Sequence, residues 1–259
     1  MATCISNGFR GLALSLFLVA SSPTARAQLS GADTLRWQAQ LQGAGSWLLG
    51  NVERLLITGN GTLKHVHPQW GFYHHLSYQY GTIRRVQTED DLISRNFFYF
   101  RPKARWYPYQ MTWLERNRRR KIDFRYQIGL GGSWVAVRQP SHLLKLSLTA
   151  SVERTAFQGQ VFSISSYDQS NTVDTWRATL RIFGQHRLPQ SLQLQYECWV
   201  QPSLLAAENY RYHADLKLSL PLGEHLSLSS VIQHTYENVV LVDVQKADLY
   251  WTFGLDARF

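Results

Sequence analysis

Apolar and polar residues alternate strictly in the stretch LYWTFGLDARF, which runs from Leu249 to the last residue. Successive side chains of a β-strand point to opposite faces of its sheet, so this pattern predicts a strand with one apolar and one polar face. The apolar face would carry Leu249, Trp251, Phe253, Leu255, Ala257 and Phe259. A chain end usually frays unless it is tied into a sheet. We therefore expect the C-terminal strand to be an integral part of the fold.

The N-terminal segment has the features of a secretory signal peptide. A weakly basic start is followed by the apolar run GLALSLFLVA and by Ala25, Arg26 and Ala27 in an A-x-A arrangement. We expect residues 1–27 to be the signal peptide and residues 28–259 to form one domain. Cleavage would remove two arginines and no acids, changing the formal net charge from +9 to +7. It would leave Cys198 without a partner for an intrachain disulfide.

The rest of the chain divides into alternating segments separated by turn signals. We predict twelve strands, near residues 34–45, 51–64, 69–81, 93–105, 109–116, 122–138, 143–156, 174–186, 191–201, 209–220, 225–236 and 247–259. Five short connections contain proline, at Pro68, Pro108, Pro140, Pro189 and Pro221. Two opposite connections, RRVQTEDDLIS and QGQVFSISSYDQSNTV, are longer and polar.

This organisation is typical of an all-β fold, a single transmembrane antiparallel β-barrel of about 12 strands. The 9 Trp, 13 Tyr and 12 Phe would supply aromatic girdles at the two membrane interfaces. No apolar run approaches the ~20 residues that a transmembrane helix needs. Alternation alone also fits a soluble β-sandwich or lipocalin-like barrel, because it does not say which face points inward.

The terminal strand has a further role in the barrel interpretation. A C-terminal Phe259 preceded by aromatic residues at alternate positions, Trp251 and Phe253, resembles the signal by which the barrel assembly machinery recognises Gram-negative outer-membrane proteins. The strand would also close the barrel against the first one, because lipid does not tolerate an exposed sheet edge. Outer-membrane lipids and lipopolysaccharide are then expected partners.

Three stretches carry a resemblance to a known family. They are GNVERLLITGNGTLKH from Gly50, WLERNRRRKIDFRYQIGLGGSW from Trp113, and the terminal KADLYWTFGLDARF. On them the chain resembles the YdiY-like family of salt-induced outer membrane proteins, a domain of unknown function numbered 481. The resemblance covers most of the mature chain and implies an outer-membrane barrel. It implies no substrate, cofactor or catalytic residue.

The polar face of the predicted strands is rich in basic residues. It would carry Arg36, Arg54, Lys64, Arg95, Arg101, Lys103, Arg105, Arg125, Lys145, Arg177, Arg181, Arg211, Lys217 and Arg258, against Asp123, Glu153, Glu197, Asp215 and Asp256. An open positive lumen would favour small anions, which predicts a narrow anion-preferring channel. Alternatively, the charges pair and plug a structural barrel, because buried charges must be compensated. Both interpretations stay open at this stage.

The basic run RNRRRK, Arg116 to Lys121, falls at a predicted extracellular hairpin. It could bind lipopolysaccharide phosphates or acidic polysaccharide, and the alternative is a solvated loop. The acidic stretches at Glu89–Asp91 and Asp168–Asp174 lack EF-hand spacing, and loop solvation explains them. Nucleic acid is not an expected partner, because an export signal places these groups outside the cell.

We expect neither a metal site nor an enzyme. His65 and His67 share a strand face, but His74 and His75 on the next segment are not expected to converge with them. A lipid-modifying enzyme is the remaining alternative, with Ser230, His234 and Asn238 near one strand end. Four strand residues at ~3.3 Å each separate the serine and the histidine by about 13 Å, too far for direct proton transfer.

Overall fold

The computed structural model describes residues 37–50, 53–168, 170–223 and 226–257, so the predicted signal peptide lies outside the described part. Within these residues the chain forms one antiparallel 12-stranded sheet, β1 to β12 in sequence order. The strands are β1 Trp37–Leu48, β2 Arg54–Val66, β3 Trp70–Ile83, β4 Val86–Phe100, β5 Trp106–Asn117, β6 Ile122–Gln139, β7 His142–Phe157, β8 Thr172–Arg187, β9 Gln193–Pro202, β10 Tyr210–Pro221, β11 Leu226–Glu237 and β12 Ala247–Ala257.

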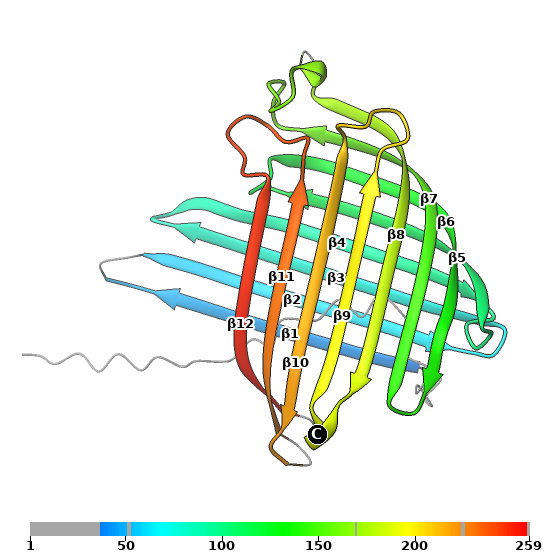
Figure 1. The fold of residues 1–259 in the computed structure, drawn as a ribbon. Coiled ribbons are helices and arrows are strands. Elements are labelled where there is room, and N and C mark those ends of the chain that lie inside the picture. The colour runs from blue at the N-terminus through cyan, green and yellow to red at the C-terminus, as the bar shows by residue number, and fades with distance from the viewer. Residues whose placement is uncertain (1–36, 51–52, 169, 224–225, 258–259) are drawn as a thin grey trace, which may run out of the picture.

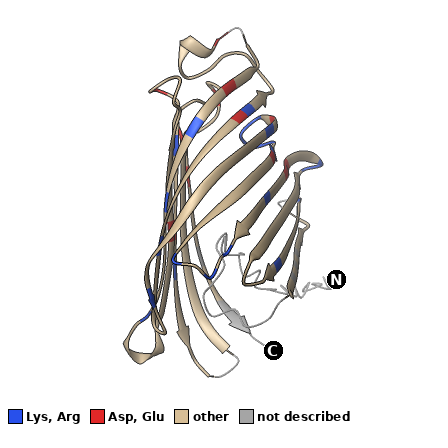
Figure 2. Ribbon diagram, turned by 90° about the vertical axis from the view of Figure 1, so that its right-hand side faces the viewer, with Lys and Arg blue, Asp and Glu red and all other residues tan. Residues whose placement is uncertain are grey.

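The sheet curls strongly, so that its first and last strands lie on opposite sides of one interior. In Figure 1, β1–β4 cross behind β9–β12, and Figure 2 shows the same curl from the side. Each strand pairs with its sequence neighbours, and no ladder joins β1 to β12 in the described part of the chain. A meander of this kind is the topology of up-and-down barrels. No helix of the described residues is long and apolar enough to cross a membrane.

Twelve strands were expected and the described residues form twelve, but the third connection is much shorter than predicted. The stretch RRVQTEDDLIS was expected to be a long loop, whereas β4 begins at Val86 and pairs with β3 directly after a two-residue turn. Arg84 and Arg85 form that turn with φ of 49° and 64°. Two left-handed residues fit the right-handed twist of a hairpin. Asn and Gly usually occupy these positions, so two arginines give no turn signal.

A second difference concerns Pro108, which lies inside β5 and not in a turn. It pairs with Gly132 of β6, while the β4 ladder ends at Tyr109. Proline is tolerated where a strand has lost one neighbour, because no donor to that neighbour is needed. The turn is formed instead by residues 101–105.

The connections at the two ends of the sheet differ in length. One end, called the loop end below, carries the connections 84–85, 118–121, 158–171, 203–209 and 238–246. The other, the turn end, carries 67–69, 101–105, 140–141 and 188–192. The two 3-10 helices are η1 Ser165–Tyr167 at the loop end and η2 Pro189–Ser191 at the turn end. The long connection predicted at 158–173 is therefore present.

The two faces of the sheet have an inverted distribution of polarity. On β7 the polar side chains from Lys145 to Thr155 at alternate positions are buried, while Leu148 is 61 % exposed between them. On β6, Leu130 is 69 % exposed between the buried Gln127 and Ser133. Water-soluble sheets bury their apolar face. Here the polar face lines the interior of the curl and the apolar face points outward.

Candidate functional site in the sheet interior

Four arginines that the sequence placed on the polar face lie inside the curl. Arg125, Arg177, Arg181 and Arg211 are at most 8 % exposed. Arg125 projects from β6, Arg177 and Arg181 from β8, and Arg211 from β10. The residues on either side of each arginine in its strand point outward. Buried guanidinium groups are costly unless they are paired. Their partners therefore determine what the interior can do.

Glu153 on β7 is the centre of the pairing. Its Oε1 accepts hydrogen bonds from Nε and Nη2 of Arg177 at 3.0 and 2.9 Å. Its Oε2 accepts one from Nη2 of Arg211 at 2.5 Å. The Nε of Arg125 lies 4.0 Å from Oε1. One carboxylate thus contacts three guanidinium groups from three other strands.

Glu237, the last residue of β11, forms a second centre. Its carboxylate pairs with Arg125, with Nη1 of Arg120 at 2.9 Å and with Nη1 of Arg211 at 3.5 Å. Glu115 of β5 completes the set by accepting from Nη1 of Arg125 at 3.1 Å. These contacts join β5 and β6 to β10 and β11 across the interior. We call this set the ion-pair network: Arg120, Arg125, Arg177, Arg211, Glu115, Glu153 and Glu237.

Arg181 forms a separate pair nearer the middle of the interior. Its Nε and Nη2 donate to Oε1 of Glu197 at 3.1 and 2.8 Å, and its guanidinium lies over the Phe97 ring, 5.2 Å from the centroid. Glu197 Oε2 is buried and has no hydrogen-bond partner within the described residues. This pair lies between the ion-pair network and the aromatic side chains of the turn end.

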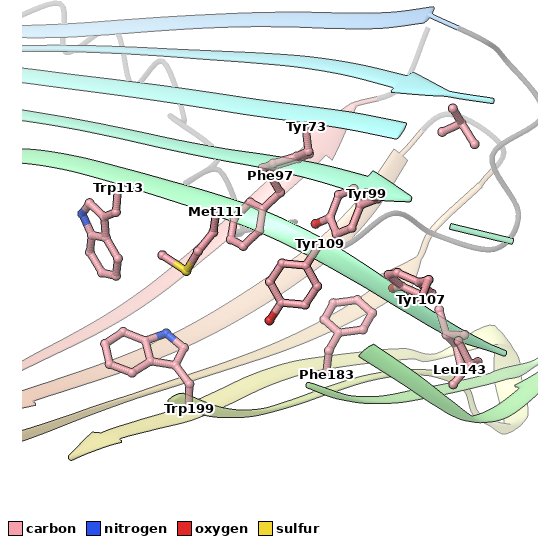
Figure 3. Packing of buried hydrophobic residues seen from close by; sticks show 12 residues of the cluster. Tyr73, Phe97, Tyr99, Tyr107, Tyr109, Met111, Trp113, Leu143, Phe183 and Trp199 are labelled. Carbon is pink, nitrogen blue, oxygen red and sulfur yellow. The ribbon is translucent and has the colours of Figure 1, made fainter. Parts of the chain in front are cut away.

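The interior at the turn end is filled by the aromatic cluster, in which Tyr99 and Tyr107 are at most 1 % exposed. Rings from β3–β5 face rings from β8 and β9 (Figure 3). Tyr109 reaches across β6 to hydrogen-bond Thr149 of β7 at 2.6 Å, which the absent side chain of Gly131 permits. The members are Val66, Tyr73, Phe97, Tyr99, Tyr107, Tyr109, Met111, Trp113, Val135, Leu143, Phe183 and Trp199.

The basic run RNRRRK is tied to acids on both sides of the loop end. Arg116 pairs with Asp90 at 2.6 Å, and Arg119 pairs with Asp91 at 2.8 Å, both on β4. Arg120 contacts Glu237 and also Asp248 of β12, the latter at 2.5 Å, and Lys121 binds Asp243. The acidic stretch at Glu89–Asp91, expected to be a solvated loop, thus lies on a strand, and its two aspartates pair with this run.

The loop end also carries a small apolar core, the loop cluster. It consists of Ile122, Phe157, Phe162, Val173, Val239 and Leu241. Phe162 and Leu241 form an isolated bridge, and the Ser163 N–H donates to the Val240 carbonyl at 2.8 Å. The connections 158–171 and 238–246 are therefore packed together over the loop end of the interior.

Three predicted lumen residues lie elsewhere. Arg101, Lys103 and Arg105 were expected on a strand face, but they are exposed in the β4–β5 turn because β4 ends at Phe100. Arg54 is half-buried and lies 3.7 Å from Glu89. Lys217 is half-buried on the inward side of β10. Arg36 and Arg258 lie outside the described residues, as does Phe259.

The predicted acidic partners also need correction. Asp123 is exposed, because an irregularity in the β6–β7 ladder between Ile122 and Phe124 breaks the alternation there. Sequence reasoning missed Glu115 and Glu237 as interior partners. Glu115 lies two residues after the inward-facing Trp113 on β5, so the alternation along the strand could have identified it as inward-facing. Glu237 is the last residue of β11, where alternation along the strand gives little information about the direction of a side chain.

The histidine, serine and terminal-strand residues have other neighbours. The described residues contain no cluster of three or more His, Cys, Asp or Glu side chains that could hold a metal ion. Ser230 accepts from Trp251 Nε1 at 3.0 Å, and His234 stacks on Tyr212 at 5.5 Å between ring centroids. Trp251 and Phe253 point outward, 62 % and 65 % exposed. The serine and the histidine are thus engaged with different residues.

One comparison with known proteins agrees with the resemblance seen in the sequence. The model of a protein family described as "Protein of unknown function, DUF481" matches residues 45–259. The chain belongs to the DUF481 family. Among solved structures, this DUF481 protein is similar to one titled "NanC porin structure in rhombohedral crystal form", with a TM-score of 0.49 and 9% identity over 86% of this chain and 99% of that one. No curated protein matches the chain.

Proposed function

We propose that this DUF481 protein is an outer-membrane β-barrel whose interior is closed by its own side chains. The observation that carries the proposal is the inverted polarity of the sheet. Ile128, Leu148 and Leu180 are 48 %, 61 % and 50 % exposed on the outward face, while the charged side chains are buried on the inward face. An apolar outer surface of this extent is stable in lipid and not in water.

The dimensions of the outward face support a membrane span. Phe124 and Trp134 are outward-facing aromatic residues near opposite ends of β6, with Ile128 and Leu130 between them. Ten residues at about 3.3 Å, tilted by about 40°, correspond to roughly 25 Å along the barrel axis. This is about the height of the apolar band of an outer-membrane barrel, which aromatic girdles border on both sides.

Contacts that span the interior support the proposal that it is closed. Arg125 of β6 binds Glu237 of β11, and Arg211 of β10 binds Glu153 of β7. An open pore along this axis would separate these groups, and breaking a buried pair costs about 3–5 kcal/mol. The aromatic cluster fills the remaining interior toward the turn end. The proposal therefore favours a plugged barrel, with no catalytic step, over an open channel.

An anion-preferring passage is the second candidate, favoured by the charge of the turn end. Lys145 is 2 % exposed on the inward face, 5.9 Å from the centroid of the Phe183 ring, and Arg101, Lys103 and Arg105 are exposed in the β4–β5 turn at the same end of the sheet. In Figure 2 the acidic residues lie mainly toward the loop end. A positive entrance of this kind would attract small anions if the interior rearranged to open.

Planar-bilayer recording distinguishes the two candidates. We expect the refolded chain, verified as a heat-modifiable barrel, to be electrically silent because its interior is closed. Discrete current steps with an anion-selective reversal potential in a salt gradient would contradict the closed interior and establish the second candidate.

Membrane insertion itself is tested by Leu148→Arg, which places a charge in the middle of the outward apolar band. We expect this variant to lose about 2–4 kcal/mol of folding free energy in lipid vesicles. Val161→Arg is the matched control, because Val161 is 64 % exposed in a loop. Equal effects of the two substitutions would count against the membrane proposal.

The outer-membrane partners belong to the same proposal. Outer-membrane lipids and lipopolysaccharide would contact the exposed apolar band, and the barrel assembly machinery would bind the C-terminal strand. The basic run is not offered as a phosphate site, because four of its side chains already pair with acids.

Deleting Phe259 should lower the yield of assembled barrel in cells. Normal yield would remove the assembly signal from the proposal.

A further inference from the structure

Two histidines face each other on neighbouring strands at the turn end. His142 is the first residue of β7, and it lies opposite His186 of β8 in the ladder between these strands. In the adjacent opposing pair, the Arg187 N–H donates to the Ser141 carbonyl at 2.7 Å. His142 and His186 are therefore a non-hydrogen-bonded pair of the antiparallel ladder, the kind in which opposing side chains lie closest. The register of β7 and β8 thus brings two imidazole rings together.

The two rings approach each other through equivalent nitrogen atoms. Nδ1 of His142 lies 3.1 Å from Nδ1 of His186, and the ring centroids are 5.3 Å apart. Bonds of about 2.0–2.1 Å at angles of about 90–110° place two nitrogen ligands of one metal ion about 2.9–3.4 Å apart. The observed separation lies in this range. It also fits a hydrogen bond from one Nδ1–H to the other Nδ1, so a proton and a metal ion would compete for the same position.

Tyr196 of β9 contacts the other nitrogen of His186. Its hydroxyl lies 3.2 Å from Nε2, and its ring stacks on the imidazole with 5.6 Å between centroids. When Nε2 carries the proton and donates it to this hydroxyl, Nδ1 presents a lone pair toward His142. Histidines that bind metal ions almost always donate their other N–H in this way. The Tyr196 ring fills the space above Gly184, where a Cβ would collide with it. Tyr196 is thus a positioning residue.

The histidine pair lies at the edge of the outward apolar band. Alternation along β7 and β8 puts His142 on the same face as the exposed Leu148, and His186 on the same face as the exposed Leu180. Both histidines are half-buried, and the β7–β8 turn follows at once. Arg187 points to the opposite face by the same alternation. Water at the turn end can therefore reach the two Nδ1 atoms.

We infer that His142 and His186 bind one divalent transition-metal ion, with water completing its coordination. Imidazole nitrogen suits Cu²⁺, Ni²⁺ and Zn²⁺, and Cu²⁺ binds such ligands most tightly. The site has two protein ligands, so it is smaller than the three-residue clusters that the described part of the chain lacks. It lies on β7 and β8, which are neighbours in the sheet (Figure 1), and it does not depend on a closed interior.

Calorimetric titration of the refolded barrel in detergent with Cu²⁺ tests the inference, using residues 28–259 without a polyhistidine tag. We expect saturable binding of one equivalent, and an electron paramagnetic resonance spectrum with coupling to two imidazole nitrogens. His142→Gln and His186→Gln should each weaken binding about tenfold or more, because a lost ligand costs at least as much as a lost outer partner.

His234→Gln is the matched control. His234 is also half-buried on a strand, but its ring stacks on Tyr212 and not on a second imidazole. We expect this variant to bind Cu²⁺ as the parent does. Tyr196→Phe removes the acceptor for His186 Nε2 and should weaken binding less than the loss of a histidine. Its spectrum should keep the coupling to two nitrogens, because both ligands remain.

No saturable binding by the folded parent, coupling to a single nitrogen, or unchanged affinity in either histidine variant would overturn the inference. An equal loss in His234→Gln would overturn it as well. If His142→Gln fails to fold, His186→Gln decides the question. These results are independent of insertion and conductance: a silent, membrane-inserted barrel that binds no Cu²⁺ would leave the proposed function intact.

Discussion

The two halves of the interior are filled by opposite chemistry. At the loop end, Arg125, Arg177 and Arg211 are buried with Glu153 and Glu237 in the ion-pair network. At the turn end, tyrosines, phenylalanines and tryptophans pack in the aromatic cluster (Figure 3). Ion pairs need fixed geometry and lose much when one partner is removed. Aromatic packing is less directional but sensitive to volume. The halves should therefore fail in different ways when they are altered.

The largest effect is expected for Glu153→Gln. Its carboxylate contacts three guanidinium groups and its side chain is 1 % exposed, so neutralising it leaves buried positive charge uncompensated. We expect a loss of about 3–5 kcal/mol in unfolding free energy, measured by urea titration in lipid vesicles. Asp174→Asn, which breaks an exposed pair with Arg154, should cost far less, because solvent screens that pair. Similar losses would mean that the network adds no more than a surface pair.

A smaller loss is expected when volume is added to the aromatic half. An alanine Cβ at Gly131 would lie 2.7 Å from the Leu148 carbonyl oxygen and 2.7 Å from Tyr109 Cζ. Gly131→Ala should therefore cost about 1–3 kcal/mol by the same titration. Gly59→Ala is the control, because a Cβ there has nothing within 4 Å. A tolerated Gly131→Ala would show that the aromatic half is loosely packed.

Removing one hydroxyl from the aromatic half should cost less again. Tyr109→Phe eliminates the buried hydrogen bond to Thr149 and keeps the ring, which predicts a loss of about 1 kcal/mol. Tyr78→Phe serves as the reference, because its hydroxyl donates to Asp90 at 3.3 Å on an exposed surface. If the two variants are equally stable, ring packing alone holds this half together.

The smallest effect concerns the outer rim of the ion-paired half and depends on pH. The hydrogen bond from Lys121 holds the pKa of Asp243 below its usual value. The stabilisation that this pair gives to the 238–246 connection is therefore complete above the usual aspartate pKa. It is lost as pH falls through the lowered pKa of Asp243. Hydrogen exchange of residues 238–246, corrected for intrinsic rates, should accelerate at low pH. In Asp243→Asn, the amides of residues 238–246 should exchange fast at every pH. If that variant keeps the same pH response, this pair is not its cause.

Most of the strand pattern could be read from local sequence. The long strands β6, β7 and β8 were predicted to within a few residues, because alternation is strong over Leu144–Val152 and similar runs. Errors occurred where local signals were unusual. The Arg84–Arg85 turn carries no glycine or asparagine, and Pro108 was read as a turn although it lies in a strand.

The candidate site could be predicted in kind but not in detail. The two-residue alternation along each strand placed Arg125, Arg177 and Arg211 on the polar face, since the direction of a side chain in a strand is a local property. It did not reveal that Glu237 would meet Arg125, because 112 residues separate them. Nor did it reveal that Arg95 and Trp113 would face residues of β7, β8 and β9 in the interior, because that arrangement depends on five strands meeting.

The sequence by itself determined the all-β fold, the number of strands and, within the regular strands, which residues share a face, because all three follow from periodicity along the chain. Only the tertiary structure decided that the charges meet as pairs and that the basic run binds acids on β4 and β12. The physical reason is the curl of the sheet. It brings distant strands together across the interior, and the small twist accumulated at each strand pair fixes which groups meet.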